Sequence, residues 1–525
     1  MITPIDIQVT NSILSAIAEE MGLVLQRSAF SSNIKERRDF SCAIFDKDAR
    51  LLAQAAHIPV HLGAMPDTIK MVKEEFNLSQ GDVIITNDPF SGGTHLPDIT
   101  LIAGVFDEDG KELLFYLACR AHHADVGAKI PGSMALTRSL DEEGVLIKPS
   151  YLSVGGDIIE DYFNELVNQM RNPLERAGDL KAQIASLFRG AKRLKSILGS
   201  SEKGKFLNTL PHLLSYGKRF MAKTISEIPD GVYEFEDFLD DDGVSSEPVP
   251  IKVKLTISSD KVFVDFEGTS PQRPSCVNAT ISVTRSAVYY CFFCLVGEGY
   301  PVNAGSLEPI IIRAPKGSLL NPEPPVPVAG GNVETSQRIV DCVFGALSKA
   351  LPKRIPAASC GTMNNIAIGG STKEGEEFTY YETIGGGMGA RPGKDGISAI
   401  QVHMTNTLNT PIEALEQTYP MIIERYAIRD GSGGKGRFVG GDGIIRRYKF
   451  LSPCTISLFT ERRKLAPYGL FGGEDGKKGK NLLFKGSKSQ PQSLPGKCIL
   501  RLEKGDSLEI RTPGGGGHGL INLDK

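Results

Sequence analysis

The chain has 525 residues, of which 41% are hydrophobic and 23% charged, and its net charge is −3 at pH 7. This is ordinary globular composition in a chain too long for one core, so we expect roughly two to four domains. No block of Lys or Arg stands out, which argues against nucleic acid or an anionic membrane as the main partner.

The N-terminal segment, Met1–Gly22, has no basic leader, and no apolar run in the chain reaches about 18 residues. We therefore expect neither a secretory signal nor a membrane span. The nine cysteines are scattered, as is typical of buried thiols in a reducing cytoplasm, so we expect a cytoplasmic protein. Cys291 and Cys294 lie in an aromatic run, which favours a core helix over a redox or zinc pair.

The first region, residues 1–150, alternates helices with short strands. A helix is predicted from the N-cap Thr3 and Pro4, with Ile5, Val9, Ile13 and Ile17 repeating every fourth residue. A hairpin is expected from strands at 40–45 and 51–55, followed by a helix at 61–76. Two strand-like apolar runs, Val83–Thr86 and Leu113–Cys119, each lead into a polar cluster.

Residues 151–230 are predicted to be helical, including a long helix at 171–198 with Arg176, Lys181, Arg189 and Lys192 on its polar face. The polar run 176–183 is either a solvated helix face or part of an interface or site. Residues 231–360 form an α+β region with strands at 232–235, 251–257 and 261–265, a Pro/Gly-rich loop at 316–331 and a helix at 334–351. Residues 361–525 are Gly-rich and β-rich. The expected fold class is thus mixed α and β (α+β), multi-domain, with a β-rich, Gly-rich C-terminal part.

The two polar clusters span residues 87–98 and 120–127, and they share a His-x-x-Asp pattern at His95/Asp98 and His122/Asp125. Two imidazoles and one carboxylate can bind a divalent ion and leave positions open for water or substrate. His95 and Asp98 with one of His122 and His123 fit that set. A metal-free acid/base cluster and a purely structural network are the alternatives.

Other catalytic motifs do not support a function. A Walker A pattern and a G-x-S-x-G elbow are absent from the sequence. Residues 431–436 match G-x-G-x-x-G, but the sequence that follows does not indicate a long helix, which argues against a dinucleotide site. The Gly-rich loops are more typical of tight turns in a β-rich fold than of anion sites.

The two clusters, together with residues 32–37, 59–63, 176–183, 268–272, 381–391 and 432–441, resemble the hydantoinase B/oxoprolinase family over essentially the whole chain. That family includes the B subunit of ATP-dependent N-methylhydantoinase, the C-terminal half of 5-oxoprolinase and a large subunit of acetone and acetophenone carboxylases. The resemblance implies an ATPase partner of the hydantoinase A/oxoprolinase type in a hetero-oligomer. That partner would bind ATP and phosphorylate an amide or enol oxygen. It also implies a metal held by His95, Asp98 and His122, with zinc, manganese and iron(II) all suited to the ligands.

The function implied is hydrolysis of a C–N bond in a five-membered cyclic amide after activation by the partner. A water activated at the metal would attack the activated carbon. Asp88, His123 or Asp125 would take and return protons, and Arg120 and His61 would hold the substrate carboxylate or phosphate. A ketone carboxylase subunit and a non-catalytic scaffold for the ATPase are the alternative functions.

Overall fold

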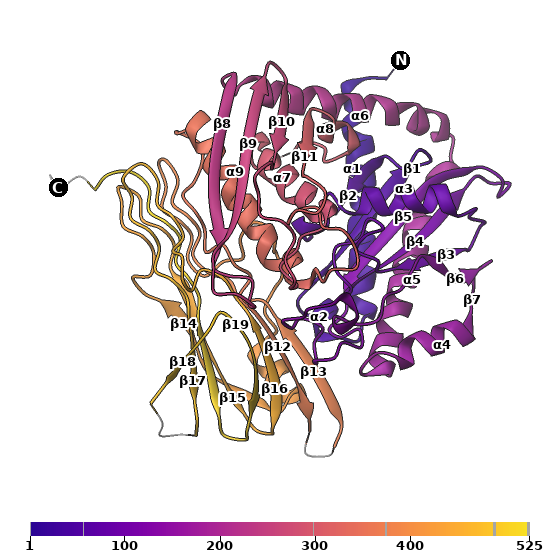
Figure 1. Cartoon of the computed structure of the whole chain (residues 1–525). Coiled ribbons are helices and arrows are strands. Elements are labelled where there is room, and N and C mark those ends of the chain that lie inside the picture. Colours follow the sequence, from indigo (N-terminus) through magenta and orange to yellow (C-terminus); the bar gives the residue numbers. More distant parts are fainter. Residues whose placement is uncertain (1, 56, 298, 373–374, 487–489, 522–525) are drawn as a thin grey trace.

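The computed structural model describes residues 2–55, 57–297, 299–372, 375–486 and 490–521. Figure 1 shows an N-terminal sheet with its helices, a second sheet beside two long helices, and C-terminal sheets in orange and yellow. The expected mixed α and β class with a β-rich C-terminal part is confirmed.

The N-terminal sheet has seven strands in the order β2-β1-β5-β4-β3-β6-β7, and all neighbours are antiparallel. Its two longest strands, β4 and β5, lie near the middle and form a hairpin with each other. The strands are β1 (Phe40–Asp46), β2 (Leu51–Gln54), β3 (Val83–Thr86), β4 (Asp98–Phe106), β5 (Leu113–His122), β6 (Ser150–Val154) and β7 (Asp157–Ile158).

Helices cover both faces of this sheet, so its strands are buried on both sides. Side chains alternate between the faces. Cys42 and Leu117 join the core under helices α1 and α5, whereas Ala43 and Ala118 join the core under α3. The helices of this part are α1 (Pro4–Ser28), α2 (Ser32–Lys35), α3 (Met65–Glu75), α4 (Glu160–Asn168), α5 (Pro173–Leu198) and α6 (Lys203–Ser226).

The predicted N-terminal helix begins where expected, and Ile13 and Ile17 pack in the core as its apolar face, but the first two residues of that predicted face do not. Thr3 and Asp6 form a capping box at the start of α1, whereas Ile5 is 73% and Val9 50% exposed. A strict four-residue repeat advances about 40° around a helix at each step because a turn has 3.6 residues. The buried face instead follows mixed three- and four-residue steps, at Thr10, Leu14, Ile17, Ala18, Met21 and Leu25.

The polar face predicted for the long helix is also corrected at one position. Lys181 and Arg189 of α5 are exposed, but Arg176 is fully buried and pairs with Glu175 and Asp179. This half of α5 packs on the sheet and against α1, so Arg176, Asp179 and Gln183 are enclosed, while Lys181 stays at the surface. Most of the polar run 176–183 is therefore not a solvated face.

The middle sheet has the order β11-β10-β9-β8, with β10 and β11 parallel and the other pairs antiparallel. It packs on α9, which is preceded by a π-helical turn, Gly331–Thr335. The predicted strands and helix of this region are confirmed. Cys291 and Cys294 lie in helix α7 as expected, but Cys291 is buried whereas Cys294 is exposed. The elements are β8 (Gly231–Leu239), β9 (Val249–Ser258), β10 (Lys261–Asp265), α7 (Ile281–Val296), α8 (Ala304–Leu307), β11 (Ile310–Arg313) and α9 (Ser336–Ala350).

The C-terminal part has two antiparallel sheets, β13-β12-β16-β19 and β14-β15-β20-β17-β18, which enclose one core between them. Ile366 and Ile456 enter this core from the first sheet, and Tyr448 and Ile510 from the second. The elements are β12 (Asn365–Ser371), β13 (Glu377–Glu382), α10 (Ile412–Thr418), β14 (Met421–Arg429), β15 (Gly443–Phe450), β16 (Cys454–Phe459), β17 (Lys480–Phe484), β18 (Gln492–Leu494), β19 (Lys497–Leu502) and β20 (Ser507–Arg511).

The Gly-rich segments of this part pack backbone against backbone. Gly515 N–H donates to Gly441 O over 2.9 Å, and Gly434 N–H donates to Gly515 O over 2.8 Å. A Cβ on Gly515 would lie 2.1 Å from Met388 O, and one on Gly387 1.9 Å from Gly441 O. The high glycine content thus permits close approach of neighbouring chains.

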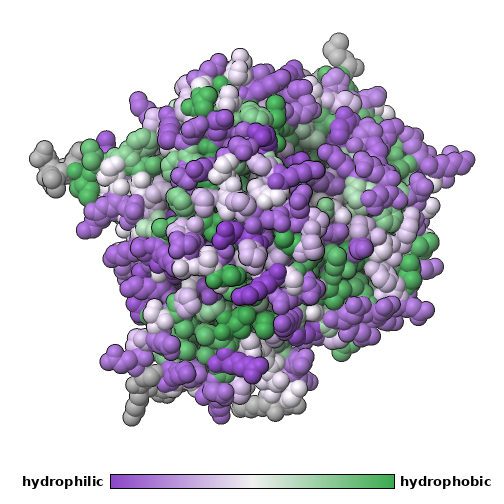
Figure 2. Space-filling view, in the orientation of Figure 1, coloured by the Kyte–Doolittle hydropathy of each residue, from purple (hydrophilic) through white to green (hydrophobic). Residues whose placement is uncertain are grey.

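The face shown in Figure 2 is largely hydrophilic, with apolar atoms gathered in places low in the view. Among the described residues, no helix is both long and apolar enough to cross a membrane. Both observations agree with the ordinary composition of the chain.

Candidate active site

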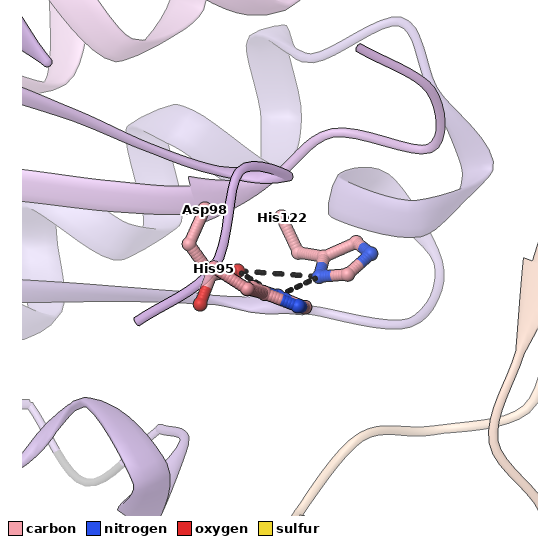
Figure 3. Close-up of side chains that lie close together, drawn as sticks. All are labelled: His95, Asp98 and His122. Atoms are coloured by element: carbon pink, nitrogen blue, oxygen red, sulfur yellow. Dashed lines mark hydrogen bonds and ion pairs between the residues drawn. The ribbon is translucent and has the colours of Figure 1, made fainter. Parts of the chain in front are cut away.

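Two of the predicted metal ligands face each other across a pair of strands. Asp98 is the first residue of β4 and His122 the last of β5, and they are directly opposite in the antiparallel register. Alternation along the strands places both side chains on the face of the sheet that α3 covers. The third residue, His95, lies in the loop that leads into β4 (Figure 3).

The ligand atoms of these three residues converge. His95 Nε2 lies 3.1 Å from Asp98 Oδ1 and 3.1 Å from His122 Nδ1, and the last two atoms are 3.2 Å apart. Three ligands about 2.1 Å from one ion are about 3.0 Å apart at right angles and about 3.4 Å apart at tetrahedral angles. The donor set and its spacing therefore fit a divalent metal, and His95, Asp98 and His122 are called the trio below.

The carboxylate of Asp98 is held on both sides. While Oδ1 faces the two imidazoles, Oδ2 contacts His61 Nε2 at 3.2 Å and accepts a hydrogen bond from Thr94 Oγ1. Ser41 Oγ lies 2.9 Å from the other ring nitrogen of His61. Burial favours the neutral acid, but the nearby His95 and His61 outweigh it and hold the pKa of Asp98 well below its usual range.

The imidazole of His122 is fixed by a ring contact. It stacks on Tyr381 of β13 with centroids 4.7 Å apart and planes 16° apart. Tyr381 Oη donates to Asn365 Oδ1, and Asn365 Nδ2 donates to Glu334 Oε1, each over 2.6 Å. Burial lowers the pKa of His122, which favours the neutral form that binds metals.

A fourth polar group reaches the trio from the middle part of the chain. Asn332, in the π-helical turn before α9, places its Nδ2 3.1 Å from His95 Nε2. Nothing in the sequence singles out this residue, because a Gly-Gly-Asn step in a Pro/Gly-rich stretch carries no local signal for a site.

Arg120 shares the face of Asp98 and His122 but does not contact them. Its Nε donates to Thr100 Oγ1 over 2.7 Å and its Nη2 to Thr68 Oγ1 over 3.0 Å, while Nη1 has no partner among the described residues. Burial lowers the pKa of Arg120 to about 10. Arg120 also lies 3.4 Å from Gly92 O, and Gly92 lines a pocket of about 690 Å³.

The second histidine of the pair points elsewhere. His123 Nε2 lies 3.0 Å from Gln183 Oε1 on α5, and burial, followed by the positive charge of Arg176, lowers the pKa of His123 to about 4. His122 and not His123 therefore lies beside His95 and Asp98, which agrees with the assignment that the resemblance implied. The polar run 176–183 supplies the contact of His123.

Two predicted proton-transfer groups lie in local turns. Asp88 accepts hydrogen bonds from Phe90 N–H and Ser91 Oγ, each over 2.9 Å. Asp125 accepts from the backbone of Gly127 and Gly132, and it pairs with Arg171. The structure shows neither of these carboxylates in hydrogen-bond contact with the trio.

The comparisons with known proteins identify the family. The model for hydantoinase B/oxoprolinase matches residues 3–521. The chain is 41% identical to 5-oxoprolinase 1 of Arabidopsis thaliana over 98% of this chain and 42% of that protein. It is 31% identical to the B subunit of a putative D-/L-hydantoinase of Pseudomonas sp. over 99% of this chain and 90% of that protein. The chain thus spans about two fifths of the 5-oxoprolinase but most of the hydantoinase polypeptide.

Two solved structures have the same fold. An ATP-dependent caprolactamase from Pseudomonas jessenii matches with a TM-score of 0.92 and 27% identity, over 99% of this chain and 91% of the other. Acetone carboxylase matches with a TM-score of 0.89 over 98% and 76%, but at 20% identity this likeness shows the fold alone. The full-length family match and the relatives together establish that the chain belongs to the hydantoinase B/oxoprolinase family.

Proposed function

We propose that this chain is the B-type component of an ATP-dependent cyclic amidase that opens a five-membered lactam. The buried, converging trio carries the proposal, because it offers a two-histidine, one-carboxylate site in a chain of this family. The relatives support the substrate class, since oxoproline, hydantoin and caprolactam are all cyclic amides.

An ATPase of the hydantoinase A/oxoprolinase type is the proposed partner. One relative is named as the B subunit of a hydantoinase, another is ATP-dependent by name, and this sequence has no Walker A pattern. The partner would phosphorylate the lactam oxygen at the expense of ATP. Water would then add to the activated carbon, and the ring C–N bond would break as the ring nitrogen takes up a proton, leaving an acyl phosphate. A second water would release phosphate from this acyl phosphate and leave the free carboxylate.

The contacts of the site residues support a separate role for each. His95, Asp98 and His122 would hold a zinc, manganese or iron(II) ion, which supplies Lewis acidity and makes water at the site more acidic. His61 is proposed to orient Asp98, since its Nε2 faces the carboxylate and not an open position. Arg120 is proposed to bind the substrate carboxylate or phosphate through its unpartnered Nη1.

The contacts of Asp88, His123 and Asp125 also bear on whether these residues transfer protons. Asp88 and Asp125 are occupied by their own turns, which favours structural roles for both. His123 faces α5, which favours a role in holding that helix on the sheet. We therefore place the proton transfers of ring opening at the trio itself.

Elemental analysis tests the site without a substrate. The chain, purified without a metal-affinity tag, is expected to hold about one equivalent of metal, and His95→Ala and Asp98→Ala are expected to lose it while remaining folded. His212→Ala, which alters an exposed histidine on α6, is the matched control.

Turnover then tests the reaction. The wild-type chain with its ATPase partner, ATP and 5-oxoproline or hydantoin is expected to open the ring, and Asp98→Ala is expected to assemble but not to do so. A wild-type chain that binds no zinc, manganese or iron(II) would overturn the metal site. An assembled complex that opens the ring equally well with Asp98→Ala would show that the trio is structural.

A further inference from the structure

The buried carboxamide of Asn332 has hydrogen-bonding capacity that the chain leaves unused. The residue is 4% exposed, and its Nδ2 contacts His95 Nε2 at 3.1 Å. Its Oδ1 is buried and has no partner among the residues that the structure describes. Buried polar groups in folded proteins are nearly always hydrogen-bonded to protein, water or a ligand, so this acceptor can accept a further partner at the site.

The backbone around Asn332 is held rigidly. Asn332 O accepts a hydrogen bond from Ser336 Oγ over 2.6 Å. The preceding Gly331 donates to Cys276 O, and a Cβ there would lie 1.7 Å from Asn278 O. Val328 lies two residues before Gly330, and its backbone N–H donates a hydrogen bond to the Glu143 carboxylate. The carboxamide is therefore presented by a fixed turn, as a recognition group requires.

A metal at the trio would change what Asn332 can bond. The contact between His95 Nε2 and Asn332 Nδ2 uses the nitrogen lone pair that a metal ion would take. With that lone pair engaged, the Asn332 amide has both a donor and an acceptor without a partner, in a place closed to bulk water. A ligand that presents a carbonyl and an N–H on the same edge would satisfy both groups.

We propose that Asn332 recognises the substrate through its ring amide, pairing Nδ2–H with the ring oxygen and Oδ1 with the ring N–H. A five-membered lactam holds its amide in the cis form, so its C=O and N–H lie on one edge and match a primary carboxamide in two parallel hydrogen bonds. This inference rests on the proposed function and concerns the lactam before its oxygen is phosphorylated, to which it adds a reason for selecting lactams. A lactone has no N–H, and an N-methyl lactam blocks it.

Binding to the metal-loaded full-length chain tests the inference without ATP or partner. The probes are 2-pyrrolidinone, γ-butyrolactone and N-methyl-2-pyrrolidinone, and the affinity of each is measured by ligand-observed NMR titration. The wild type is expected to bind the lactam about tenfold more tightly than the other two, since one hydrogen bond changes affinity by about that factor. Asn332→Ala is expected to lose this preference, whereas Asn303→Ala, which removes a buried amide bonded to Leu213 and Ser306, is expected to keep it.

Metal content and thermal unfolding of each variant show whether the trio and the fold are intact. Should Asn332→Ala fail to fold, Asn332→Ser, which keeps a small polar side chain in the turn, replaces it and is expected to lose the same preference. An intact variant that still prefers 2-pyrrolidinone tenfold would overturn the role of Asn332. A metal-loaded wild type that neither binds nor, with partner and ATP, opens any lactam would instead overturn the proposed function itself.

Discussion

Removing His61 should weaken metal binding without removing a metal ligand. His61 Nε2 and Thr94 Oγ1 are the side-chain groups that hold Asp98 Oδ2, and His61 is 1% exposed, so water is poorly placed to replace it. A hydrogen bond to a charged group contributes about 1.5–3 kcal/mol. At about 1.4 kcal/mol for each factor of ten, His61→Leu should lower metal affinity roughly 10- to 100-fold.

Competition with a chromophoric chelator would measure that affinity in the purified chain. His61→Gln keeps a donor near the Asp98 carboxylate and should recover part of the loss, while the exposed His212→Leu should leave affinity unchanged. A folded His61→Leu chain that binds metal with wild-type affinity would refute the orienting role. A loss equal to that of Asp98→Ala would instead place His61 among the ligands.

Three further predictions concern stability, each measured as the free energy of unfolding in urea. Gly515→Ala should destabilise the chain by about 1–3 kcal/mol because its Cβ would meet a backbone oxygen, whereas Gly204→Ala, with open space on a helix, should not destabilise it. Burial raises the pKa of Glu143 to about 7, above its value in the unfolded chain, so the free energy of unfolding should fall as pH rises from about 4.5 to 7. Glu143→Gln should remove this pH-dependent loss, which amounts to about 3 kcal/mol. Gln183→Leu should cost about 1–3 kcal/mol by leaving buried carbonyls without their donor. Equal stabilities of Gly515→Ala and Gly204→Ala, an unchanged pH slope, or a neutral Gln183→Leu would each contradict the corresponding prediction.

Local patterns predicted the local elements well. The strand at Val83–Thr86 was predicted at its observed bounds, and the cap at Thr3 fixed the start of α1. Both depend on contacts between residues close in sequence. The exposed Ile5 shows the limit, because which stripe of a helix is buried depends on where the helix meets the sheet.

The family resemblance implied His122, but residue chemistry alone left the choice between the two adjacent histidines open, and the register of a strand separates them. The apolar run in the sequence ends at Cys119, but β5 continues to His122. Its alternation then sets His122 on the face of Asp98, and His123 turns to α5. Adjacent residues of a strand point to opposite faces of the sheet, so two histidines with the same chemistry have different surroundings. Amino-acid composition alone does not show this difference.

The candidate site depends on three parts of the chain at once. Its candidate ligands Asp98 and His122 lie at adjacent ends of two strands of the N-terminal sheet, Asn332 lies in the π-helical turn before the helix of the middle core, and Tyr381 belongs to a C-terminal sheet. The trio can therefore be predicted from one short stretch of sequence, whereas the residues that bury and orient the trio cannot, because they come from distant parts of the chain. Because those contacts join segments more than 200 residues apart, the site is complete only when the three parts are packed together. This arrangement suits the proposed function, because selective chemistry on a small substrate uses an enclosed site with a few fixed polar groups.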